Sequence, residues 1–333
     1  MLANPEAYGG VARAAAAHRA WDAPAPLRLW HLASLDAPSV AVAWALGFAW
    51  VVRARLPVWL LVAMALTVWV VYAGDRLLDA RASLRSGRID RLRARHQFHW
   101  SHRRILTPLA VAAAMGAAGI VFSLMPPAAF ERNTVLAGAA LVYFARVHSG
   151  GAAPALVSFR VPFLTKEMLV GVLFTAGCAL PAWNHAPTDA WALAGPVVFF
   201  AALAWLNCHA IECWEAGGAR ATRDQASSAL GVEVSHPCAG KKAQGWGTAH
   251  LWARRDGAMR EVVILGGGLC LAGLLLAVCL CIVQPRLAVL LLAGSASALL
   301  LALLDRLRGR MTPLALRVAA DLVLLTPLAL PWR

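Results

Sequence analysis

Charged side chains are scarce in this sequence. Asp, Glu, Lys and Arg together make up 14% of its 333 residues, whereas an average soluble protein has about 25%. Hydrophobic residues make up 60%, and the mean hydropathy is +0.63. This balance argues against an ordinary soluble enzyme and predicts an all-α protein that crosses a membrane several times.

Acidic side chains are the scarcer of the two signs. There are 17 Asp and Glu residues against 31 Lys and Arg, which gives a net charge of +14. A nucleic-acid partner is one explanation of such an excess. The basic residues, however, lie in short loops between apolar runs, as they do on the cytoplasmic side of membrane proteins. The sequence therefore predicts membrane lipid as a partner and no nucleic acid.

The chain also lacks a spaced cysteine framework and a start typical of a signal peptide. Most of its cysteines lie inside or beside apolar runs, so no structural disulfide is expected. The first thirty residues have no charged start followed by an apolar core. Residues 1–30 are therefore interpreted as a cytoplasmic N-terminal arm.

Long apolar runs dominate what remains. A membrane-spanning helix needs about 20 mostly apolar residues, and nine runs approach this length. They are residues 33–52, 58–79, 105–125, 133–147, 163–183, 191–212, 261–283, 287–304 and 313–331. The sequence thus predicts one transmembrane helical domain over residues 31–333, with a polar cap loop at residues 213–260.

Basic residues orient these nine runs. The loops after the second, fourth, sixth and eighth run hold 21 Lys and Arg residues, and the other loops hold 4. This asymmetry places the N-terminus in the cytoplasm and the C-terminus outside. We therefore predict a multi-pass protein of a bacterial-type inner membrane, with Arg88 and Arg93 in a solvated cytoplasmic loop.

Two aspartates close the second run, in the stretch "VWVVYAGDRLLDARAS" (68–83). Asp75 and Asp79 are four residues apart and Tyr72 precedes Asp75 by three, so all three share one helix face. Each carboxylate costs about 2.5–3.5 kcal/mol near the middle of a membrane. A cation between the two carboxylates would relieve this cost and their mutual repulsion.

The sixth run, "WLNCHAIECWE" (205–215), ends on the same side with a second polar group. Glu212 and Glu215 are three residues apart, and Asn207 precedes them at a similar depth. Three basic residues flank the start of the fifth run: Arg146, Arg160 and Lys166. Because magnesium binds through carboxylates together with substrate phosphates, this gathering predicts a lipid diphosphate carried with Mg²⁺.

These motifs resemble those of the UbiA family of intramembrane prenyltransferases. The stretch "GDRLLDA" (74–80) resembles the second half of the family's first aspartate-rich motif, and "RVPFLTKEMLVGVLFTAGCALP" (160–181) is similar to its fifth span. The leading Asn-Asp of that motif falls on Val71 and Tyr72, and the second motif reads "NCHAIECWE". The resemblance therefore extends over residues 30–330 mainly as architecture.

The resemblance implies a UbiA-like bundle that transfers a prenyl group, with Mg²⁺, from a prenyl diphosphate to an aromatic or other lipophilic acceptor. The implied catalytic residues are Asp75, Asp79 and Glu212. The implied metal ligands are Asp75, Asp79, Glu212 and Glu215. The implied substrate-binding residues are Tyr72, Arg146, Arg160, Lys166 and Asn207. No obligate protein partner is expected. The alternative is a non-enzymatic relative that binds or transports a lipid-like molecule.

Other clusters have competing interpretations. His96, His99 and His102 are spaced as zinc or iron ligands, or they belong to a basic loop that faces anionic lipid head groups. A second group, Cys208, His209, Glu212 and Cys213, offers soft-metal or haem ligands or simple packing. Arg317 and Asp321 have the spacing of a helix ion pair. The glycine run at residues 265–270 favours close helix packing.

A CDP-alcohol phosphotransferase is excluded on its motif. That family needs Asp-x-x-Asp-Gly-x-x-Ala-Arg followed by two further aspartates. The stretch "DRLLDARASLRSGRID" (75–90) lacks the leading pair.

Overall fold

The computed structural model describes residues 21–85, 93–148, 166–187, 190–229 and 258–331. These residues are helical apart from turns, and one isolated β-bridge joins Trp21 to Met311. The helices in chain order are α2 (Ala25–Leu32), α3 (Asp36–Val51), α4 (Val58–Arg85), α5 (Ala94–Ser101), α6 (Arg103–Leu124), α7 (Pro127–His148), α8 (Lys166–His185), η3 (Ala190–Leu193), α9 (Ala194–Ala229), α10 (Ala258–Leu280), α11 (Pro285–Leu307), η5 (Arg308–Arg310), α12 (Pro313–Leu322) and η6 (Val323–Ala329).

Local sequence explains several helix boundaries. Pro285 and Pro313 occupy the first turns of α11 and α12, where the missing N–H of proline costs no hydrogen bond. The Thr312 hydroxyl caps α12 by accepting from the Ala315 N–H at 3.2 Å. Between α2 and α3, Ser34 adopts a φ of 57°. This left-handed residue lets the chain turn by 87° between the two helices.

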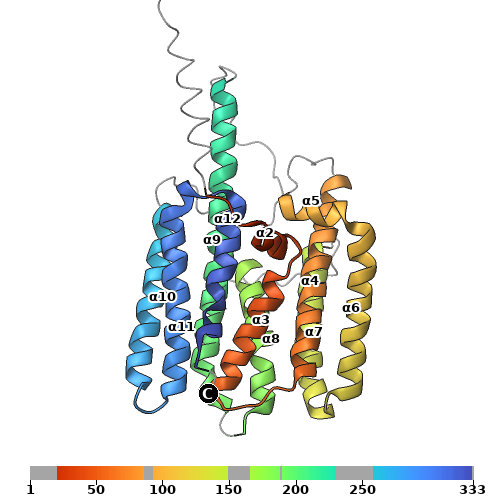
Figure 1. Ribbon diagram of the computed structural model, residues 1–333, viewed down its shortest axis with the longest axis vertical. Helices are drawn as coiled ribbons and strands as arrows, with labels where there is room; N and C mark the ends of the chain where they lie inside the picture. Colours follow the sequence, from red (N-terminus) through yellow and green to blue (C-terminus); the bar gives the residue numbers. More distant parts are fainter. Residues whose placement is uncertain (1–20, 86–92, 149–165, 188–189, 230–257, 332–333) are drawn as a thin grey trace, which may run out of the picture.

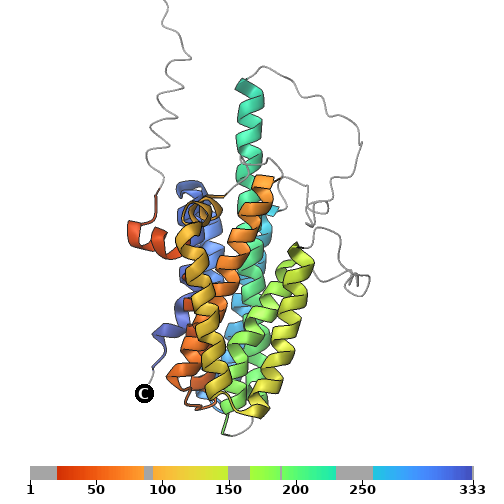
Figure 2. The same cartoon turned by 90° about the vertical axis from the view of Figure 1, so that its right-hand side faces the viewer.

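The long helices run side by side as a bundle, and successive helices alternate in direction (Figures 1 and 2). We call one end of this bundle the charged end: α3 and α12 begin there, and α4 ends there. The short helices α2 and α5 lie at this end. Helix α9 has 36 residues, or about 54 Å at 1.5 Å per residue, and it extends beyond the other helices (Figure 1).

Six helices of the described residues are long and apolar enough to cross a membrane, and a seventh span results if α2 and α3 are taken together. The predicted all-α, multi-pass membrane architecture is therefore confirmed. The remaining predicted runs are also helical: residues 133–147 fall within α7, and residues 313–331 contain α12 and η6. Nine spans stay a prediction, because α7, α12 and η6 are shorter or more polar than the helices that are long and apolar enough to cross a membrane.

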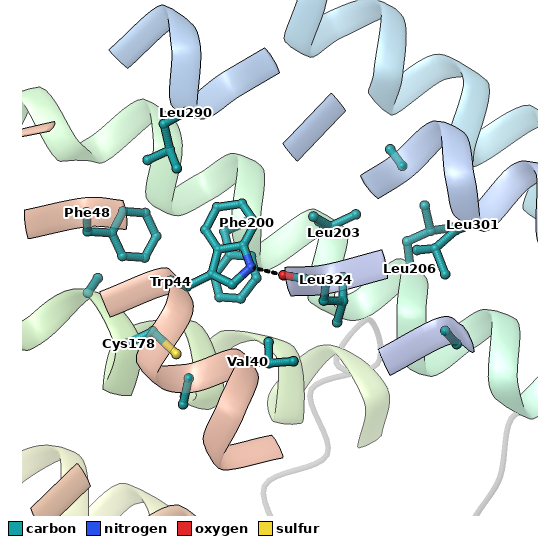
Figure 3. Close-up of a cluster of buried hydrophobic side chains, with 14 of the residues drawn as sticks. Val40, Trp44, Phe48, Cys178, Phe200, Leu203, Leu206, Leu290, Leu301 and Leu324 are labelled. Carbon is teal, nitrogen blue, oxygen red and sulfur yellow. Dashed lines mark hydrogen bonds between the residues drawn. The ribbon is translucent and has the colours of Figure 1, made fainter. Parts of the chain in front are cut away.

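The apolar core ties α3 to α9 and to the end of the chain (Figure 3). The Trp44 ring stacks on Phe200 with 3.8 Å between ring centroids. The Trp44 indole N–H donates to the Leu324 carbonyl oxygen at 2.9 Å. Because Trp44 is 1% exposed, this hydrogen bond is shielded from solvent, and it fixes how η6 and α12 lie against α3.

Glycine allows α10 and α11 to approach closely. A Cβ atom on Gly266 would lie 3.0 Å from the Ala298 carbonyl oxygen, whereas Gly267 and Gly268 have nothing within 4 Å at the same position. The predicted packing role of residues 265–270 is therefore confirmed at Gly266.

Candidate functional site

Each aspartate of the α4 pair lies against a nitrogen group at the charged end. The Asp75 carboxylate accepts from the Arg76 guanidinium at 2.8 Å. The Asp79 carboxylate lies 3.7 Å from Nε2 of His96 on α5. The Arg76 guanidinium also lies over the Tyr72 ring, 5.7 Å from its centroid, where a cation–π contact is favourable. Asp75, Asp79 and Tyr72 thus share one surface of α4, as predicted from their spacing.

His96 lies within the electrostatic influence of four arginines. Its side chain is buried, at 7% exposure. Burial, and after it the guanidinium groups of four arginines, lower the pKa of His96 to about 3. They are Arg95, Arg76, Arg93 and Arg317. Because these arginines come from α4, from α5 with its N-cap, and from α12, four positively charged side chains converge here.

Glu215 of α9 forms ion pairs with two of these arginines. Arg93, at the N-cap of α5, approaches one oxygen of its carboxylate, and Arg317 of α12 approaches the other. Burial lowers the pKa of Arg93, Arg76 lowers it too, and the carboxylates of Glu212 and Asp79 raise it. Arg93 therefore lies near both predicted acidic pairs, and these pairs meet at the same end of the bundle.

Arg95 belongs to the same cluster. Burial, together with the charges of Arg76 and Arg93, lowers its pKa to about 9, and Asp321 and Asp36 oppose this shift. Buried Nε atoms of Arg95 and Arg76 have no hydrogen-bond partner among the described residues. Because a pKa of about 9 leaves Arg95 charged at neutral pH, its buried N–H group is available to an incoming acceptor.

The other sequence-predicted residues are placed only in part. Asn207 on α9 is 7% exposed, and its Oδ1 atom has no hydrogen-bond partner among the described residues. Arg146 belongs to α7 and Lys166 begins α8, but their side chains are outside the described part of the structure. Arg160 lies outside the described residues altogether. The three predicted phosphate contacts therefore stay predictions.

Sequence reasoning missed the arginine cluster. Arg93 was predicted to be solvated, and it is exposed, but it also contacts Glu215. Arg317 was paired with Asp321, whereas it too contacts Glu215. Arg317 is 8% exposed and lies in an apolar run. An ionisable residue in such a run indicates a functional site by default, and this signal was present in the sequence.

A second polar group lies between α2, α3 and α12. Nδ1 of His31 lies 2.8 Å from the Asp36 carboxylate and 3.0 Å from the Asp321 carboxylate. One potential ligand atom from each residue lies within 4.8 Å of the others. Among the described residues, this is the one such group of three His, Cys, Asp or Glu side chains. The predicted magnesium ligands do not meet this criterion: no three of their ligand atoms lie within 4.8 Å of one another. These residues are Asp75, Asp79, Glu212 and Glu215.

The two other predicted metal clusters have local partners instead. His99 lies 2.9 Å from the Arg95 carbonyl and His102 lies 2.8 Å from the Phe98 carbonyl. On α9, Nε2 of His209 lies 3.6 Å from the Cys213 sulfur and 3.9 Å from the Glu261 carboxylate of α10. These contacts agree with the interpretation of both clusters as polar and packing contacts.

No protein-family model, curated protein or solved structure matches this chain. The geometry is therefore the basis for any functional conclusion. Four guanidinium groups lie beside a membrane bundle, and in two of them, Arg76 and Arg95, the buried Nε atom has no hydrogen-bond partner among the described residues. Such a group of donors suits an anion with several acceptor oxygens.

Proposed function

We propose that this protein binds a prenyl diphosphate at the charged end and transfers its prenyl group to an aromatic or other lipophilic acceptor. The observation that carries the proposal is the convergence of Arg76, Arg93, Arg95 and Arg317 around His96. Arginine is suited to phosphate because its planar guanidinium donates two parallel hydrogen bonds. An apolar bundle beside these donors suits the prenyl chain.

Charge balance supports a multiply charged ligand. Glu215 is shared by Arg93 and Arg317, and Asp75 is bound by Arg76. The N–H donors of four arginines exceed the acceptors that these two carboxylates offer. A diphosphate would supply the missing acceptor oxygens, and its charge would offset the repulsion among the arginines.

The resemblance to the UbiA family carries the transfer step. Magnesium would be held by Asp75, Asp79, Glu212 and Glu215, whose hard carboxylate oxygens fit it chemically, and it would help neutralise the diphosphate as a leaving group. The arginines would bind and orient the diphosphate. Tyr72 would line the pocket, and the surrounding apolar helices would exclude water from the allylic centre.

The proposed topology has nine spans with the charged end in the cytoplasm of a bacterial-type cell. Two observations support it: the 21-to-4 distribution of Lys and Arg, and the alternation of the helices, in which α4, α7, α9 and α11 all end at the charged end (Figure 1). Prenyl diphosphates made in the cytoplasm would reach the arginines directly from that side.

One observation favours a second candidate, a protein that binds or moves the lipid without reacting with it. Asp75, Asp79 and Glu215 already lie against Arg76, His96, Arg93 and Arg317. Carboxylates held in this way are less available to a metal ion, whereas an anion needs only the arginines. In this candidate, binding of the prenyl diphosphate requires no Mg²⁺.

Binding of farnesyl diphosphate to the purified protein tests the proposal, with inorganic diphosphate as the probe for the head group alone. We expect Arg95→Met to weaken binding of both probes at least about tenfold, because a charge-assisted hydrogen bond contributes about 1.5–3 kcal/mol. The control is Arg104→Met, an exposed arginine at the same end, which should bind like the parent. Equal affinities of the parent and Arg95→Met would refute the proposed site.

Turnover separates the two candidates. Lipids extracted from cells with and without the protein should differ by a prenylated acceptor if transfer occurs. Farnesyl diphosphate that binds equally with Mg²⁺ and with EDTA, and leaves no prenylated product, would establish the binding protein instead.

A further inference from the structure

His31, Asp36 and Asp321 bring three ligand atoms together from three separate elements. His31 lies on α2, Asp36 begins α3, and Asp321 lies near the end of α12. Nδ1 of His31 is 2.8 Å from one carboxylate and 3.0 Å from the other. Since 290 positions separate His31 from Asp321, only the tertiary fold explains this convergence.

The surrounding structure keeps these side chains in place. The Ser34 turn bends the chain between His31 and Asp36, and the Trp69 indole of α4 donates to the Ala33 carbonyl in that turn at 2.9 Å. The hydrogen bond from Trp44 to Leu324 fixes η6, which directly follows the Asp321 turn of α12. A site preorganised on rigid elements pays little ordering entropy when it binds its ligand.

Two carboxylates face one imidazole nitrogen in this group. The Asp36 and Asp321 side chains are mostly buried, at 13% and 16% exposure, and each lies against Nδ1 of His31, so a metal cation between the three ligand atoms would offset two buried negative charges. His31 is 3% exposed, and its other ring nitrogen, Nε2, has no hydrogen-bond partner among the described residues. The ring is thus positioned by its Nδ1 contacts with the two carboxylates.

The ligand distances suit a small dication. Tetrahedral coordination at about 2.0–2.1 Å separates neighbouring ligand atoms by about 3.3 Å. The two observed N–O distances need to widen by only a few tenths of an ångström to reach this value. One imidazole with two carboxylates, and room for water or substrate as a fourth ligand, is typical of an open site.

We propose that His31, Asp36 and Asp321 form a binding site for a divalent transition-metal ion of the manganese-to-zinc series. A nitrogen ligand selects these ions over Mg²⁺, which prefers oxygen ligands. A bound divalent ion would offset the charge of both carboxylates. This site is separate from the four carboxylates assigned to Mg²⁺ above, and it does not depend on the proposed prenyl transfer.

The His31 group lies near the arginine cluster. Asp36 and Asp321 are close enough to Arg95 to raise its pKa. An ion bound between the two aspartates therefore lies in the electrostatic neighbourhood of the arginine cluster. A phosphate oxygen reaching past Arg95 would be a suitable fourth ligand.

Metal content tests this inference with the metal alone, in the absence of any phosphate compound. The purified protein is stripped with a chelator, incubated with Zn²⁺, desalted and analysed by elemental mass spectrometry. We expect about one Zn²⁺ for each parent chain, in keeping with three protein ligands. We expect retained zinc to fall at least about tenfold in His31→Gln and in Asp321→Asn. An excess of Mg²⁺ should not displace zinc from the parent.

Two controls keep the result specific. His102→Gln changes an exposed histidine at the same end, and Asp22→Asn changes an acid that contacts Arg28 and Thr312; both variants should retain zinc like the parent. Each variant is first shown to elute as the parent does in size-exclusion chromatography. A third ligand variant, Asp36→Asn, replaces any ligand variant that fails this check. A parent that retains no zinc, or zinc retained by all three ligand variants, would overturn the site. Neither result bears on farnesyl diphosphate binding, which is measured through Arg95.

Discussion

Glu215 is held from two directions, by Arg93 from α5 and by Arg317 from α12. Arg317 is buried, and without this carboxylate it would be an unpaired cation among apolar helices, which is strongly unfavourable. The shared carboxylate leaves the cluster with fewer acceptors than donors. At the scale of single residues, this site is therefore stable when empty and still has hydrogen bonds to offer a ligand.

His96 makes the stability of the protein depend on pH. Burial and the arginines lower its folded-state pKa to about 3 from its ordinary value of 6.5. Above 6.5 the residue is neutral whether the chain is folded or unfolded. Below 6.5 only the unfolded chain takes up the proton, so stability falls as the pH drops from 6.5 towards 3. The groups that face His96 are Asp79 and the four arginines.

We therefore expect the parent to lose about 2 kcal/mol more than His96→Gln between about pH 7 and about pH 5. Apparent melting temperatures in detergent, recorded for both proteins across this range, measure the difference. His102→Gln is the matched control, and it should follow the parent. Parallel pH profiles for the parent and His96→Gln would show that His96 titrates normally.

At the scale of elements, the indole of Trp44 joins α3 to η6. Trp44 donates to the carbonyl of Leu324, in the short 3₁₀ segment η6. A 3₁₀ helix is wound more tightly than an α-helix, and here the Leu324 carbonyl points at the Trp44 indole. Without this donor the buried carbonyl would be unpaired, which costs about 1–3 kcal/mol. The same contact keeps Asp321 beside Asp36.

Trp44→Phe should destabilise the protein by about 2–4 kcal/mol, because it removes the donor and also leaves a small cavity. Trp50→Phe is the comparison, since Trp50 makes the same kind of bond to the Pro331 carbonyl in an exposed position. That change should cost about 0.5–1.5 kcal/mol. Thermal unfolding in detergent ranks the two, and a larger loss for Trp50→Phe would contradict the assigned role of the Trp44 bond.

Helices were predictable from the sequence, whereas partners across helices were not. An apolar run of suitable length is a local property, so every predicted run contains a helix. The spacing of Arg317 and Asp321 favoured a pair within one helix, but Glu215 and His31 approach these residues from other elements. His31 itself follows directly on a segment interpreted as an arm, in which α2 begins at Ala25. Periodicity carries no information about such contacts.

At the scale of the whole molecule, the bundle separates its chemistry from its apolar body. The helices α2 and α5 lie at the charged end (Figure 1). The His31 group includes a residue of α2, and the arginine cluster includes a residue of α5. Below them the helices are almost entirely apolar, and many large hydrophobic side chains on α6, α7 and α10 face outward, as lipid contact requires. Water-soluble groups and lipid chains can therefore meet at one boundary.

Reporter fusions test the proposed orientation. Fusions after Arg95 and after Lys242 should both report cytoplasm, because the basic loops are retained there. A fusion after Arg333 should report the opposite side, since nine spans bring the chain end across the membrane. A cytoplasmic signal after Arg333 would require an even number of spans, and α7, which is not among the six helices long and apolar enough to cross a membrane, would be the first to remove.

Arg317 and Asp321 both lie on α12, which the ribosome makes after the helices that carry the other members of their groups. Chains are synthesised from the N-terminus, and early parts fold while later parts are still unmade. The arginine cluster lacks one member, and the His31 group lacks one carboxylate, until α12 has been made. A nascent chain that has not yet made α12 therefore has neither group complete, and neither a diphosphate nor a metal ion could contact all of their members before then.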